Sequence, residues 1–482
     1  MKEKTLYLRQ FLWYTIKMEA NIQMSDTIKK ALSGCASHAE IRRQIYRTRR
    51  VAVLSGSLVT NISSKAAGAC ARVYRNGVWG FASIGDLSDA HVEEILRSAR
   101  ENAVLLDSRK PKNKGPLTLS APAVYRAERP FQETDQKQLI DFAMALESYI
   151  GENCPHVTSR SVAVIADCIE KELFTSEGAC AHQLFPRTYV VVSLSAETDD
   201  GETVELYDIF GGGAGYFTDY YGDPAALHPA VDQLYNELMQ KREGVFPEAG
   251  ERLCIIDSVI SGMVAHEAVG HTVEADLVLA GSVAAGSIGK TVASGLINLT
   301  DFAHTAFGET APLPVYADDE GVMCKDAPLI RDGVLVGYMN NLESARHFGM
   351  EPCGNARAFA FSDEPLIRMR NTAIHPGENT LEEMIASVEN GYYLTKTRNG
   401  QADTTGEFMF GVTMGYEIKN GKLGRALRDT TISGVAFEML KTVDMLSDTV
   451  HWDFAGYCGK KQPMPVSLGG PALRCKVNVG GR

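Results

Sequence analysis

Ala265-His266-Glu267-Ala268-Val269-Gly270-His271 lies inside an apolar run, Val259 to Leu279, on which the fold and chemistry of this chain depend. The run has the pattern of a buried helix. Two histidines that flank a glutamate on such a helix can give a metal two neutral imidazole ligands, with a general base beside them. The segment therefore predicts the chemistry of a zinc hydrolase.

The spacing of the two histidines does not fit a metal site on a regular α-helix. The familiar zinc signature H-E-x-x-H places its histidines about 40° apart on a helix, whereas His266 and His271, five residues apart, would be separated by about 140°. They can share a metal only if a π-bulge absorbs one residue. We expect this bulge at Gly270, where no Cβ resists the distortion.

The same residues also allow a simpler interpretation, in which an ordinary packing helix carries a Glu267–His271 pair at i, i+4. Glycine and two histidines are poor choices for a helix that serves only packing. This composition favours the metal site over the packing helix.

Composition sets the class of protein. With 482 residues, 45% of them hydrophobic, the chain can bury a large core and is expected to form two or three domains. A net charge of -12 argues against nucleic acid as a partner, since phosphate binding needs clustered Lys and Arg. Ten cysteines without a C-x-x-C pattern indicate free thiols in a reducing cytoplasm.

The N-terminal residues 1–24 are predicted to be a loosely attached extension. Their apolar run, Phe11 to Ile16, is too short for a signal sequence or a membrane span. We therefore expect a cytoplasmic protein with no membrane partner.

The expected fold is α+β, or mixed α/β, in two domains. Residues 25–245 are predicted to form an α/β domain, with a hairpin at Asn76-Gly77, helices over 88–106, 135–150 and 224–241, and a strand meander between Val157 and Phe210. The glycine run Gly211 to Tyr216 lacks the Lys and Ser/Thr of a phosphate-binding loop and is interpreted as a loop or bulge.

Residues 246–482 are predicted to form a mostly antiparallel β domain that carries the metal-binding helix. Asp332-Gly333 and Asn420-Gly421 predict hairpins. Thr380 begins a capping box, and Gly391 is expected to cap the end of that helix. A further helix is expected over Ser433 to Leu446.

A catalytic zinc usually takes a third protein ligand and keeps a fourth position open for water. Spacing alone does not choose this third ligand. The candidates are Glu274, Asp276, His304, His451 and Cys458.

Several motifs in order resemble the TldD branch of the TldD/TldE (PmbA) metallopeptidases, the "modulator of DNA gyrase" family. The metal-binding helix looks like that family's H-E-x-x-x-H helix, and the Asn76 to Ala82 segment agrees more loosely. The further matches are Asp318-Asp319-Glu320-Gly321, Gly337-Tyr338-Met339, Gly354-Asn355-Ala356-Arg357 and Gly456-Tyr457-Cys458-Gly459-Lys460.

The resemblance implies that His266, His271 and Cys458 bind zinc and that Glu267 is the general base. It implies a zinc-dependent peptidase of broad specificity that acts on unfolded or small peptides inside a closed dimer. That dimer is either a homodimer or a heterodimer with an inactive TldE/PmbA-like paralogue. A thiolate ligand such as Cys458 suits the reducing cytoplasm.

The alternative function is that of a non-enzymatic assembly or chaperone-like subunit. An intact Glu267 favours the enzyme, since such a subunit has no need of a base beside two ligands. The run after Cys458 departs from the family pattern: a Gly-Lys-x-Gly-Gln type run is expected, and the chain has Gly459-Lys460-Lys461-Gln462.

Overall fold

The protein is seen in a computed structural model that describes residues 25–109, 112, 114–117 and 119–481. The extension predicted for residues 1–24 lies outside this described part. Within it, both expected kinds of structure are present, and the mixed α/β class is confirmed.

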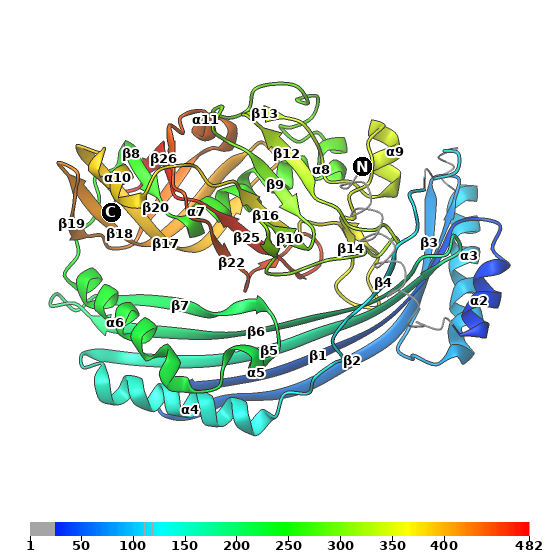
Figure 1. The fold of residues 1–482 in the computed structure, drawn as a ribbon, viewed down its shortest axis with the longest axis horizontal. Helices are drawn as coiled ribbons and strands as arrows, with labels where there is room; N and C mark the ends of the chain where they lie inside the picture. Colours follow the sequence, from blue (N-terminus) through cyan, green and yellow to red (C-terminus); the bar gives the residue numbers. More distant parts are fainter. Residues whose placement is uncertain (1–24, 110–111, 113, 118, 482) are drawn as a thin grey trace, which may run out of the picture.

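A long curved sheet forms the N-terminal half (Figure 1). Its strands in the described chain follow the order β3-β2-β1-β5-β6-β4, and β7 also pairs with β6. The pairs are antiparallel except for β4 with β6. The strands are β1 (Ala39–Leu54), β2 (Ser57–Arg75), β3 (Val78–Ile84), β4 (Val124–Arg126), β5 (Val157–Thr175), β6 (Cys180–Glu197) and β7 (Thr203–Ala214).

The turns of this sheet follow from its sequence. Asn76 and Gly77 take left-handed conformations, with φ of 49° and 94°, and connect β2 to β3 as predicted. The predicted meander is β5-β6-β7. Near its end, Tyr189 pairs with Gly211 and Thr188 with Gly213, so the glycine run contains the expected bulge.

Helices cover the outer face and one end of the sheet. Figure 1 shows α4 (Gln136–Asn153) and α6 (His228–Arg242) beneath the sheet, and α2 (Asp26–Ser33) and α3 (Val92–Arg109) beyond β3. The predicted apolar face of α4 is buried in one cluster with strand residues such as Val162 and Val190. The amphipathic spacing thus placed α3, α4 and α6 correctly, whereas α2 was not predicted.

Five strands of the C-terminal half close on themselves, because β17 pairs with both β8 and β18. They are β8 (Gly250–Ile256), β17 (Asn390–Ala402), β18 (Glu407–Lys419), β20 (Thr430–Val435) and β26 (Leu473–Val479), with β19 (Lys422–Ala426) and β21 (Met445–Leu446) attached. Most pairs are antiparallel, as expected; β8 with β17 is parallel.

A second C-terminal sheet has the order β13-β12-β9-β16-β25-β22 in the described residues. Both predicted hairpins of this half are present, at Asp332-Gly333 and at Asn420-Gly421. The strands of this sheet are β9 (Leu299–Phe302), β12 (Ala327–Arg331), β13 (Val334–Leu335), β16 (Asn371–Ile374), β22 (His451–Asp453) and β25 (Ser467–Gly470).

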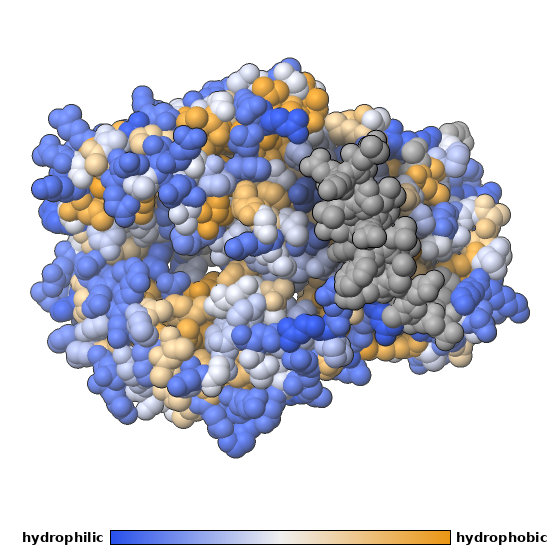
Figure 2. Space-filling view, viewed as in Figure 1, coloured by the Kyte–Doolittle hydropathy of each residue, from blue (hydrophilic) through white to orange (hydrophobic). Residues whose placement is uncertain are grey.

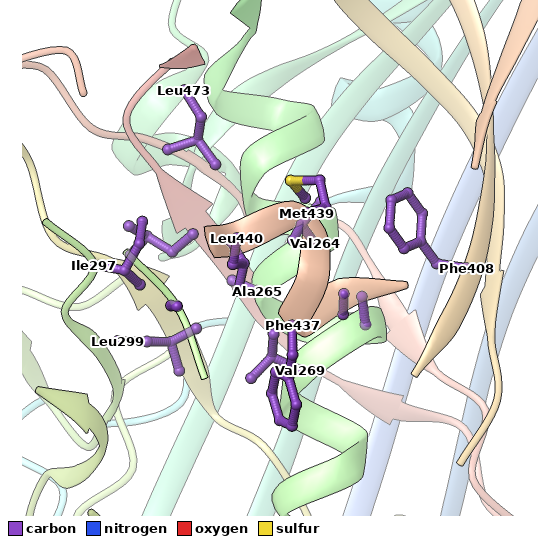
Figure 3. Close-up of a cluster of buried hydrophobic side chains, with 14 of the residues drawn as sticks. Val264, Ala265, Val269, Ile297, Leu299, Phe408, Phe437, Met439, Leu440 and Leu473 are labelled. Atoms are coloured by element: carbon purple, nitrogen blue, oxygen red, sulfur yellow. The ribbon is translucent and has the colours of Figure 1, made fainter. Parts of the chain in front are cut away.

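The apolar run 259–279 lies between these two sheets and is not one helix. It begins as α7 (Ser258–Met263), widens into a π-helical turn over Val264–Gly270, tightens at His271–Val273 and ends as α8 (Ala275–Leu279). Figure 3 shows residues of the π turn packed beneath α11 (Ala436–Lys441). Each fully buried Leu or Phe in such a core contributes about 1.5–3 kcal/mol.

Two helix predictions in this half are wrong in part. The helix expected over Ser433 to Leu446 is only α11, because β20 continues to Val435 and pairs with β18, and tertiary pairing overrides helical spacing. The capping box at Thr380 is present, but α10 (Leu381–Ala386) ends before Gly391. Gly391 lies in β17, where an added Cβ would come within 2.3 Å of the Leu253 carbonyl oxygen.

The surface is hollowed between the N-terminal sheet and the C-terminal body (Figure 2). The hollow includes a cleft of about 790 Å³ between β7 and α6 on one side and α7 and β17 on the other. Met263, the residue before the π turn, lines this cleft. Among the helices of the described chain, none has both the length and the apolar character needed to cross a membrane.

Candidate metal centre

The π turn resolves the spacing of the two histidines. The backbone N–H of His271 donates to the carbonyl oxygen of His266, which is an i→i+5 bond. This bond confirms the predicted bulge. The two imidazole rings lie with their centroids 5.2 Å apart and nearly perpendicular.

Cys458 reaches the same point from a distant part of the chain. It lies on β23 (Tyr457–Cys458), which pairs with β24 (Met464–Pro465). Its Sγ lies 3.3 Å from Nε2 of His271. One ligand atom from each of His266, His271 and Cys458 falls within 4.8 Å of the others, and no other such group of three was found in the described residues.

The surroundings of His266 fit a metal ligand. The residue is buried, and neither ring nitrogen has a hydrogen-bond partner among the described residues. Burial, aided by His271 and Arg368, lowers the pKa of His266 well below its usual range, so the ring is neutral. A buried neutral imidazole with unpaired nitrogens, beside a second imidazole and a thiol, is a donor set that suits zinc.

His271 is oriented by a carboxylate behind it. Its Nδ1 donates to Glu274, at 2.7 Å, which leaves Nε2 facing Cys458. Burial lowers the pKa of His271, but the bonds to Cys458 and Glu274 outweigh it and raise the pKa to about 10. A carboxylate that holds the far nitrogen of a metal-binding histidine is a recurring feature of zinc sites.

Glu267 lies beside the donor atoms. Its Oε2 is 3.6 Å from Nε2 of His271, and a quarter of its side chain is exposed. Burial raises the pKa of Glu267, and Glu274 adds to this while His271 opposes it. A partly accessible carboxylate with a raised pKa has the properties of a general base that works near neutral pH.

Two cations to which the sequence reasoning gave no role lie beside the donor atoms. Arg368, fully buried, donates from Nη1 to Sγ of Cys458 at 3.4 Å. Lys460 lies 3.1 Å from Glu274 and from Asp276. Glu274 was predicted only as a candidate third ligand, although its i, i+3 spacing to His271 could have indicated the supporting role. Nothing in the sequence pointed to Arg368.

The remaining third-ligand candidates lie elsewhere or serve the site indirectly. Glu274 supports His271, Asp276 pairs with Lys460, His304 stacks on Tyr316, and His451 lies exposed on β22. The acidic motif at 318–321 joins the two halves: Asp319 pairs with Lys171 and Glu320 with Arg72.

The reason expected for Gly270 is wrong. Its φ of -52° and ψ of -50° are ordinary helical values that any residue can adopt. An added Cβ would instead lie 2.2 Å from Sδ of Met369. Glycine is required here for close packing, not for backbone freedom.

The turn after Cys458 reflects its unusual sequence. Lys461 takes a left-handed conformation, with φ of 58°. Gly459 before it has open space around the position of a Cβ. The departure from the family pattern thus leaves a non-glycine residue in a conformation that favours glycine.

Family models and known proteins match this chain over most of its length. Family models match residues 39–103 (PmbA/TldA metallopeptidase domain 1), 129–236 (central domain) and 250–481 (C-terminal domain). A metalloprotease of Methanothermobacter thermautotrophicus is 30% identical over 476 residues, covering 96% of this chain and 100% of the relative. A zinc metalloprotease TldD homolog of Saccharolobus solfataricus is 27% identical over 95% of this chain and 100% of its own.

A solved structure shares the fold. TldE from Thermococcus kodakarensis superposes with a TM-score of 0.73 at 18% identity, over 92% of this chain and 97% of its own. Together with the family models and the near full-length relatives, this shows that the chain belongs to the PmbA/TldD family of metallopeptidases.

Proposed function

We propose that this chain is a zinc-dependent peptidase of broad specificity that hydrolyses unfolded or small peptides. The observation that carries the proposal is the convergence of two imidazoles and one thiol beside Glu267. His266, His271 and Cys458 would hold the zinc. When bound, zinc supplies a Lewis acid that makes a water molecule far more acidic.

The side chains have separate roles in this proposal. Glu267 takes the proton from the attacking water and can return it to the leaving amine. Glu274 keeps Nε2 of His271 turned toward the donor set. Arg368 offsets the negative charge of the Cys458 thiolate.

We propose extended peptides as substrates. A strand can add to an exposed sheet edge through main-chain hydrogen bonds, which do not depend on side-chain identity and so give broad specificity. The cleft between the two halves, lined by Met263 beside the π turn, offers such a chain a way in. Faster cleavage of a denatured protein than of its folded form is expected.

We further propose a cytoplasmic dimer, formed with a second copy or with a TldE/PmbA-like paralogue. The cysteines of the described chain are all free, which suits a reducing compartment. The fold shared with TldE supports a paralogue of similar shape as the partner.

The test compares Glu267→Gln with the wild type. The variant should retain zinc, because the carboxylate is not a ligand, and should lose about 10²- to 10⁴-fold in turnover of an unstructured peptide. Glu438→Gln, on the exposed surface of α11, is the matched control. If Glu267→Gln cleaved at the wild-type rate, Glu267 would not be the general base; a wild-type chain that binds zinc but cleaves no peptide would instead favour the non-enzymatic alternative.

A further inference from the structure

The cysteine of the metal centre is anchored to the opposite half of the molecule. Its neighbour Tyr457 donates from its hydroxyl to Oδ2 of Asp167, at 3.0 Å. The guanidinium of Arg187 lies 4.2 Å from the centre of the Tyr457 ring. Nη1 of Arg187 also donates to the carbonyl oxygens of Gly456 and Phe454, at 3.2 and 3.4 Å.

Asp167 and Arg187 are built into the N-terminal sheet as a pair. They are direct cross-strand partners on β5 and β6, so their side chains leave the sheet on the same face. Both side chains are more than nine-tenths buried. Long paired strands hold them rigidly, which makes the sheet a fixed support for the segment 454–458.

Anchoring Tyr457 constrains Cys458. Successive side chains of an extended segment point to opposite sides, so on β23 the tyrosine faces the N-terminal sheet while the cysteine faces the histidines. A twist of the backbone that released Tyr457 would therefore turn Sγ away from His271. Pairing of Cys458 with Met464 supports the strand from its other side.

Stabilisation of the domain contact alone does not account for this cluster. Nε and Nη2 of Arg187 and Oδ1 of Asp167 have no hydrogen-bond partner among the described residues. They line a cavity of about 40 Å³ with Tyr457. Incompletely paired buried charges contribute little to stability, and apolar residues would join two halves equally well.

We propose that Asp167, Arg187 and Tyr457 are positioning residues that hold Cys458 in place to complete the metal centre, so that zinc affinity depends on the N-terminal sheet. The inference rests on the zinc site of the proposed function. None of the three residues touches the donor atoms of the histidines; each acts through the segment that carries Cys458.

Zinc affinity, measured by competition with a chromophoric chelator, tests this directly. Tyr457→Phe and Asp167→Leu should each weaken zinc binding about 10- to 100-fold, the range for residues that orient metal ligands. The Tyr457→Phe/Asp167→Leu double variant should bind zinc no more weakly than the worse single one, because leucine has no acceptor and both changes remove the same hydrogen bond. Tyr149→Phe, which breaks a tyrosine–aspartate bond to Asp232 between α4 and α6, is the control and should bind zinc normally.

Arg187 is tested with two variants in case one fails to fold. Arg187→Ala should weaken zinc binding most, and Arg187→Lys should restore part of it by keeping the charge without the planar stacking. Thermal unfolding in excess chelator shows whether each variant is folded without metal. A folded Arg187→Ala that binds zinc like the wild type would overturn the proposal.

The two ideas fail in different ways. Wild-type zinc affinity in both Tyr457→Phe and Asp167→Leu would overturn the positioning role while leaving the zinc site intact, even if the KM for peptide rose because Tyr457 touches substrate. Absence of zinc binding by the wild type would instead remove the proposed function.

Discussion

Gly270→Ala tests whether close packing, not backbone freedom, fixes the glycine of the π turn. The new Cβ would lie 2.2 Å from Sδ and 3.2 Å from Cε of Met369, and 3.0 Å from the carbonyl oxygen of Ala265. Met369 is fully buried and cannot swing into solvent. Overpacking of this kind costs about 1–3 kcal/mol in the free energy of unfolding, and a displaced π turn should also weaken zinc binding.

A second substitution separates this cause from others. Met369→Ala alone leaves a cavity and should cost about 2–5 kcal/mol. If the clash is the cause, the double variant will lose less than the sum of the two single losses, by about 0.5–3 kcal/mol. The measurement is urea unfolding of each protein, with zinc and with excess chelator.

Gly85→Ala is the matched control, because no atom lies within 4 Å of the new Cβ and the backbone there is not left-handed. It should change the free energy of unfolding little. The packing explanation would be refuted by strict additivity of Gly270→Ala and Met369→Ala, or by a Gly270→Ala protein as stable as the wild type.

Three further predictions follow from the fold. Burial raises the pKa of Asp257, the N-cap of α7, to about 8; since the native state then holds a proton that the unfolded state has released, this group makes stability fall as pH rises from about 4 to 8. Asp257→Asn keeps the cap but carries no titrating carboxyl group. Its free energy of unfolding in urea should therefore rise relative to that of the wild type between pH 5 and pH 8, and a difference that does not change with pH would contradict this. Leu440→Ala, in the core around the π turn, should lower the free energy of unfolding by about 2–5 kcal/mol. The exposed Leu423→Ala should lower it by less than about 0.5 kcal/mol; equal losses from the two variants would contradict this position of the core. We also propose a domain division at 245/246, so limited proteolysis should cut first near the exposed residues 248–250, and early cuts inside α7 would count against it.

Local signals in the sequence predicted those parts of the fold that short-range chemistry decides. Asn76-Gly77 specified its turn because the pair tolerates left-handed backbone, and the apolar spacing of α4 specified its buried face. The helix expected over Ser433 to Leu446 was wrong in part because β20 is defined by its partners β18 and β26, which lie outside that segment. Pairing of distant strands leaves no mark on a single segment.

The candidate site, like the fold, could be predicted from the sequence only in part. His266, Glu267 and His271 share one turn, so their types and spacing indicated both a metal and a bulge. Cys458 was only one candidate among several until the family resemblance selected it, because spacing says nothing of a residue 187 positions from His271. Arg368 was missed altogether, since a buried arginine on a loop has no local pattern.

The π turn shows why the chemistry and the core of this half cannot be separated. A wide turn is a poor helix by itself, and the structure shows no glycine conformation that would favour it at Gly270. The π turn is held by the burial of its apolar side chains. Fully buried in one cluster with residues of α11 are Val264, Ala265, Ala268 and Val269. The extra residue that brings His271 into line with His266 is thus stabilised by apolar contacts remote from the donor atoms. Core substitutions beneath the turn should therefore weaken zinc binding even though they touch no ligand.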